Sequence, residues 1–135
     1  MYTSEVIYQG ELRCKSTHLQ SETVIFSDAP TDNHGKGESF SPTDLLATAL
    51  GNCMLTIMGT EAKRLNVNID GAKVSIKKHM GTSPRRIVKI EANMTVPNNG
   101  LTDLQMKSLT EAGINCPVAK SLHPDLIQDI NIAYP

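Results

Sequence analysis

Two cysteines occupy positions where a thiol could do chemistry. Cys53 lies within LLATALGNCMLTIMG, a helical pattern without a charged side chain, and Cys116 stands directly before Pro117. A thiolate can attack the O–O bond of a peroxide and leave a sulfenic acid, which a second thiol converts to a disulfide. A reductant then resets the pair by thiol–disulfide exchange. One thiol in a buried helix and one at a helix N-terminus suit these two roles.

Cys53 also has an inert interpretation. It belongs to the helical stripe Leu46, Ala49 or Leu50, Cys53 and Ile57, and a cysteine on such a stripe is usually a small buried hydrophobe. Apolar burial raises the pKa of a thiol and suppresses its reactivity. Catalysis by this residue therefore requires a nearby cation that holds the thiolate.

Cys116 is expected at the start of a short helix, because the proline that follows it suits the first helical position. Free backbone N–H groups and the helix dipole stabilise a thiolate there, so the position predicts a lowered pKa for this thiol. The alternative is a neutral residue at the helix start with no reactive role. Cys14 shares a strand face with Leu12, which favours buried packing.

Other chemistries lack their usual signals. There is no CxxC or HxxxH spacing, and His18, His34, His79 and His123 are not paired as metal or triad residues would be, so we expect no metal and no cofactor. A net charge of −1 and a pI of about 6.4 give no sign of nucleic-acid binding. We expect a cytoplasmic protein for three reasons. The sequence has no signal-peptide pattern, its three cysteines are an odd number that does not suit a secreted disulfide framework, and its apolar-rich run at 45–58 is too short to span a membrane.

The alternation of apolar and polar residues predicts the order of elements. Ser41-Pro42-Thr43-Asp44 is a good helix start, with a capping residue, a proline at the first position and a capping-box acid. Strands grouped in runs favour an α+β fold with a largely antiparallel sheet over a parallel βαβ fold, in a single domain covering residues 1–135. The expected strands are 3–9, 11–17, 22–28, 72–79, 86–96 and 129–134, and the expected helices run from Ser41 to about Arg64, from Thr102 to near Gly113 and from Cys116 onward.

The long helix predicts a partner subunit. No charged residue lies between Asp44 and Glu61, whereas a surface helix normally carries a charged face. A domain of this size cannot easily bury such a helix alone, but a second copy can. Ala47, Thr48 and Gly51 are small enough for close helix approach, so we predict a homodimer with this helix at the interface.

Three segments resemble the OsmC/Ohr family of hydroperoxide-reducing proteins: GESFSPTDLLATALGNCMLTIMG, PRRIVKIEANMTV and INCPVAKSLHPDL. The resemblance covers essentially the whole chain and is closest to the plain OsmC-like branch. It implies a cofactor-free two-cysteine peroxidase in oxidative-stress defence, with Cys53 peroxidatic and Cys116 resolving. It further implies an organic hydroperoxide substrate, a dithiol reductant, and an intertwined homodimer with two long central helices and active sites at the interface.

The same resemblance implies an arginine from the N-terminal strands that holds the thiolate, and Arg13 is the natural candidate. The alternative is an ordinary surface arginine. Ohr-type members pair this arginine with a glutamate whose position here aligns with Thr43. Asp44 follows it, but lies about 13 Å along the helix axis from Cys53 and could simply cap the helix. Glu38 in the preceding loop is a weaker substitute.

Two other functions fit the same pattern. One is a dimeric module that binds small apolar molecules, with cysteines that only line a pocket. The other is a structural dimer with inert thiols. Peroxide treatment separates them from the peroxidase, because only the peroxidase forms a Cys53–Cys116 disulfide.

Overall fold

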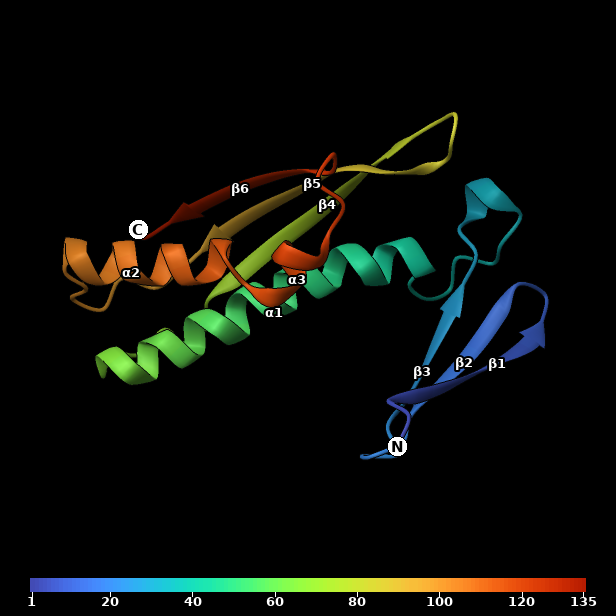
Figure 1. Cartoon of the computed structure of the whole chain (residues 1–135), viewed down its shortest axis with the longest axis horizontal. Helices are drawn as coiled ribbons and strands as arrows, with labels where there is room; N and C mark the ends of the chain where they lie inside the picture. Colours follow the sequence, from blue (N-terminus) through green and yellow to red (C-terminus); the bar gives the residue numbers. More distant parts are fainter. The chain divides into compact units, whose positions relative to one another are not determined.

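The computed structural model describes residues 1–135, which divide into two compact units, residues 1–46 and 47–135 (Figure 1). Each unit carries a three-stranded sheet. The elements follow the predicted order, with a short 3₁₀ turn added in the loop before the long helix. The expectation of a single domain over residues 1–135 stays a prediction.

The first unit is an antiparallel sheet in the order β1-β2-β3. Its strands are β1 (Ser4–Gly10), β2 (Arg13–His18) and β3 (Val24–Asp28), and the 3₁₀ turn η1 (Thr31–Asn33) follows. The register places Arg13 directly opposite Asp28 at the end of β3. A basic and an acidic side chain from two strands therefore share one sheet face.

The second unit joins three strands and two helices after the long helix. The strands are β4 (Lys73–Gly81), β5 (Arg86–Thr95) and β6 (Ile127–Ala133), and the helices are α2 (Asp103–Ile114) and α3 (Pro117–Ser121). β4 and β5 form an antiparallel hairpin, but β5 and β6 are parallel. The predicted α+β fold with largely antiparallel pairing is confirmed, since three of the four strand pairs are antiparallel. The parallel β5–β6 pair is the exception, because α2 and α3 carry the chain back across the sheet before β6 begins.

Helix α1 (Pro42–Leu65) begins as predicted. The backbone N–H of Asp44 donates to Ser41 Oγ at 3.1 Å, and the backbone N–H of Ser41 donates to Asp44 Oδ2 at 2.9 Å. These reciprocal bonds are a capping box, which satisfies two N–H groups that the first helical turn leaves free. The capping interpretation of Asp44 is thus confirmed.

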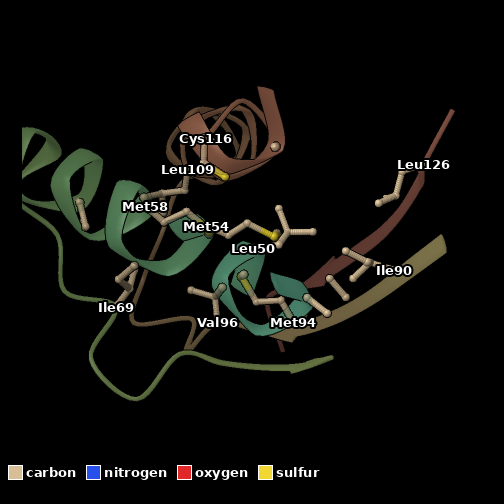
Figure 2. Close-up of a cluster of buried hydrophobic side chains, with 14 of the residues drawn as sticks. Leu50, Met54, Met58, Ile69, Ile90, Met94, Val96, Leu109, Cys116 and Leu126 are labelled. Atoms are coloured by element: carbon tan, nitrogen blue, oxygen red, sulfur yellow. The ribbon is translucent and has the colours of Figure 1, made fainter. Parts of the chain in front are cut away.

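The buried stripe of α1 consists of Ala47, Leu50, Met54, Met58 and Ala62. Their spacing of three and four residues places them on one helix face, and they pack with α2 and the β4–β6 sheet in the core (Figure 2). None of the helices combines the length and hydrophobicity needed to cross a membrane.

The predicted stripe is therefore displaced from the observed one. Cys53 and Ile57 are only half-buried beside the core, and Leu46 is exposed. Apolar or small residues occur on nearly all sides of this helix. The spacing of apolar residues in the sequence was therefore not sufficient to identify which face of α1 packs against the core.

Two small residues of α1 serve the fold of their own chain. An added Cβ at Gly51 would lie 3.0 Å from Val74 Cγ1 and 3.1 Å from Ile76 Cδ1, so α1 lies tightly against β4. Ala47 is also buried. The expectation that Ala47 and Gly51 are available for close approach of a second helix was wrong, whereas Thr48 remains only half-buried.

Candidate active site

Cys116 occupies the predicted position at the start of α3. Its backbone is extended, with φ −67° and ψ 156°, Pro117 is the first helical residue, and the thiol is fully buried. Burial raises the pKa of Cys116, and the neighbouring Cys53 thiol raises it further, against the lowering effect of the Ala119 and Val118 backbone N–H groups. The predicted lowering of this pKa was wrong, because desolvation outweighs the helix start.

Cys53 meets Cys116 inside the second unit. The Cys53 thiol lies close enough to Cys116 to raise the pKa of Cys116, although the two residues lie on α1 and α3 and are far apart in the sequence. The structure therefore brings together the two cysteines that the sequence selected.

Arg13 is held by a carboxylate that the sequence pattern did not indicate, that of Asp28. Its Nε donates to Asp28 Oδ1 at 2.7 Å and its Nη2 donates to Asp28 Oδ2 at 2.9 Å. This two-point pair lowers the pKa of Asp28 and raises the pKa of Arg13, with the hydrogen bond between them the largest cause in both. Asp28 is the last residue of the predicted strand ETVIFSD, but the sequence does not show that it faces Arg13. The two residues become opposite each other only when β2 pairs with β3.

The two carboxylates that the sequence did propose lie elsewhere. The carboxylate of Asp44 caps α1. The Glu38 side chain is 64% exposed, and its Oε1 lies 3.8 Å from Arg13 Nη2. Its backbone N–H, however, donates to Asp28 Oδ2 at 3.1 Å, so Glu38 supports the Arg13–Asp28 pair mainly through its main chain.

An open groove of about 530 Å³ lies beside Arg13 within the first unit. Apolar side chains dominate its lining, and the guanidinium supplies a polar group at its wall. The lining residues are Arg13, Val24, Ile25, Phe26, Glu38, Ser39, Phe40 and Leu45.

Cys14 lies apart from this groove. It is half-buried on β2, opposite Tyr8 and Ser27, and its neighbour Arg13 points to the other face of the sheet. No group of three or more histidine, cysteine or acidic side chains is arranged to hold a metal ion.

An α+β chain with two mixed or antiparallel sheets and a neighbouring pair of thiols defines a candidate dithiol redox protein. The sequence model of the OsmC-like protein family matches residues 35–128, and this chain belongs to that family. No curated protein matches the chain.

Solved structures agree with this assignment. A Psychrobacter arcticus protein named for an osmotic stress induced and detoxification response is 47% identical, with 98% of this chain and 96% of that chain covered and a TM-score of 0.94. An organic hydroperoxide resistance protein OsmC from Legionella pneumophila is 13% identical, with 98% of each chain covered and a TM-score of 0.72. An organic hydroperoxide resistance protein from Elizabethkingia anophelis is 15% identical, with 100% and 98% covered and a TM-score of 0.76. The last two support the fold.

Proposed function

We propose that this protein is a thiol-dependent peroxidase that reduces organic hydroperoxides through Cys53 and Cys116. The observation that carries the proposal is the proximity of these two thiols, from α1 and α3, in a chain of the OsmC-like family. The printed names of two structural neighbours, which refer to organic hydroperoxide resistance, support the choice of substrate.

The chemistry balances with these two residues and an external reductant. The Cys53 thiolate attacks one oxygen of ROOH, so that an S–O bond forms, the O–O bond breaks and the departing alkoxide takes a proton to become ROH. The Cys116 sulfur then attacks the sulfenic sulfur and expels the oxygen as water, leaving a disulfide. A dithiol returns two electrons and two protons by exchange, becomes oxidised itself and restores both thiols.

Arg13 is proposed as the cation that holds the Cys53 thiolate and orients the peroxide. A guanidinium is permanently charged and presents several N–H groups in a fixed plane. Asp28 uses Nε and one N–H of Nη2, which leaves Nη1 for a further acceptor. Asp44 is proposed to act only through the start of α1.

A homodimer is part of the proposal. Val6, Ile7 and Tyr8 on β1 are 62%, 58% and 63% exposed in the single chain, and exposed apolar surface of this kind marks a protein interface. On α1, Asn52 and Thr56 donate side-chain hydrogen bonds to the backbone carbonyl four residues earlier. Such internally bonded side chains can be covered by a second copy at little desolvation cost.

The decisive test compares single cysteine variants in a hydroperoxide assay with cumene hydroperoxide and dithiothreitol. Cys53→Ser is expected to abolish peroxide consumption, whereas Cys14→Ser, a matched change outside the thiol pair, is expected to retain it. Mass spectrometry after peroxide treatment is expected to show loss of two hydrogens in the wild type but not in Cys116→Ser. Full activity of Cys53→Ser would end the proposal.

The apolar groove beside Arg13 supports a second candidate, a module that binds small apolar molecules. This candidate predicts saturable binding of a fluorescent apolar probe, without disulfide formation on peroxide treatment. Peroxide turnover that requires Cys53 would exclude it as the main function. The mass measurement on the same sample therefore decides between the two.

A further inference from the structure

We infer that Asp28 is the positioning residue for Arg13, in place of a carboxylate at Glu38 or Asp44. The inference rests on the proposed function, because Arg13 is the cation proposed to hold the Cys53 thiolate. Asp28 is assigned no contact with substrate, so its effect on the reaction passes through the guanidinium.

The contact between the two side chains fixes both the place and the plane of the guanidinium. Two parallel N–H···O bonds, of 2.7 and 2.9 Å, join Nε and Nη2 of Arg13 to the two carboxylate oxygens of Asp28. A two-point contact restricts rotation about the last bonds of the arginine side chain, which a single ion pair does not. The unused Nη1 therefore projects in one direction.

Asp28 is itself immobilised by the fold. Its side chain is 1% exposed, and its position opposite Arg13 follows from the pairing of β2 with β3. Its backbone N–H donates to the Phe40 carbonyl at 3.1 Å, and Oδ2 accepts the backbone N–H of Glu38 at 3.1 Å. The loop before α1 thus holds Asp28 at two points, one on its backbone and one on its carboxylate.

The rival carboxylates lack these features. Glu38 approaches one nitrogen of Arg13 at 3.8 Å from a side chain that is 64% exposed, and exposed ion pairs of this kind contribute little. The carboxylate of Asp44 accepts the backbone N–H of Ser41 at 2.9 Å as a helix cap. Only Asp28 combines burial with two bonds to the guanidinium.

A role through charge and a role through positioning predict opposite effects on the Cys53 thiolate when the Asp28 carboxylate is removed. If Asp28 acted only as a nearby negative charge, Asp28→Asn would make the surroundings of Arg13 more positive and favour the Cys53 thiolate. If Asp28 positions Arg13, the same change releases the guanidinium and disfavours the thiolate. The direction of the effect therefore identifies the role.

The test measures alkylation of Cys53 by iodoacetamide as a function of pH, in the full chain with Cys14→Ser and Cys116→Ser so that one thiol remains. Asp28→Asn is expected to move the midpoint of the alkylation profile about one pH unit higher and to slow alkylation at neutral pH about tenfold. Glu11→Gln removes an exposed charge from the same region, where Glu11 pairs with Lys36, and is expected to leave the profile unchanged.

A double-variant cycle separates positioning from general damage. In an Arg13→Met background, Asp28→Asn is expected to have no further effect, because the group it acts through is absent. This pair also removes both charges, so it remains measurable if Asp28→Asn alone does not fold. Asp28→Glu keeps the charge but adds a methylene, and it is expected to fall between wild type and Asp28→Asn.

Specific results overturn the inference. They are a midpoint that moves lower or stays in place in Asp28→Asn, a larger effect from Glu38→Gln, or an equal loss in the Arg13→Met background. Failure of the proposed peroxidase has a different signature, namely a wild type that does not consume hydroperoxide. The alkylation profiles report on Asp28 and Arg13 in either case.

Discussion

Oxidation of Cys53 and Cys116 to a disulfide is expected to stabilise the folded chain strongly. The bond would close a loop of about 60 residues, for which the chain-entropy model gives about 4 kcal/mol at 25 °C. Native-state strain would subtract from this value. The two thiols are already neighbours in the reduced protein, so the rearrangement required is small.

Urea unfolding measures this effect directly. With a slope of about 2 kcal/mol/M, stabilisation of about 4 kcal/mol raises the urea midpoint by about 2 M. The comparison uses one protein concentration and the Cys14→Ser variant, before and after stoichiometric cumene hydroperoxide. Cys116→Ser, which cannot close the loop, is the control and is expected to show no rise. A midpoint that falls or stays constant although mass spectrometry shows the disulfide would refute the reasoning.

Three further results are expected from equilibrium unfolding. Leu50→Ala removes a fully buried side chain and is expected to lower the free energy of unfolding by about 2–5 kcal/mol. The same change at Leu104, which is 76% exposed, is expected to alter it by no more than about 0.5 kcal/mol. Equal losses in the two variants would contradict the core assignment. Because burial raises the pKa of Cys116, the folded state keeps this proton to a higher pH than the unfolded state does. Stability is therefore expected to fall as pH rises above the ordinary cysteine pKa of about 8.5. In urea midpoints measured between pH 7 and 10, Cys116→Ala should reduce this dependence of stability on pH. Because the Arg13 hydrogen bond lowers the pKa of Asp28, the pair stabilises the fold above the ordinary aspartate pKa of about 3.9. This stabilisation is expected to be lost as pH falls through the lower pKa of the folded state. If urea midpoints of Asp28→Asn fell with acidification as much as those of the wild type, this assignment would be contradicted.

Local sequence signals were sufficient for most of the elements. Ser41, Pro42 and Asp44 marked the start of α1, and Pro117 marked the start of α3, because capping and proline geometry act within a few residues. The pair of thiols was selected from residue type and setting, together with the family resemblance. The contact between them appears only when α1 and α3 pack in the second unit.

The features that the sequence did not predict depend on contacts between distant segments. Asp28 comes opposite Arg13 through strand pairing, and that register is not encoded near either residue. The direction of β6 depends on the path of two helices. The pKa of Cys116 was predicted from its helix start alone, but the sign is decided by how deeply packing buries the thiol.

The parallel pairing of β5 with β6 has a consequence for the order of folding. Paired residues such as Lys89 and Ile127 lie about 40 positions apart, and contacts of such separation form later than those of the β4–β5 hairpin, because a longer loop must close first. Cys116 lies within that loop. During refolding, α1, which carries Cys53, can therefore form before Cys116 has reached its position beside it. The chain should then be most vulnerable to irreversible oxidation by excess peroxide before β6 docks.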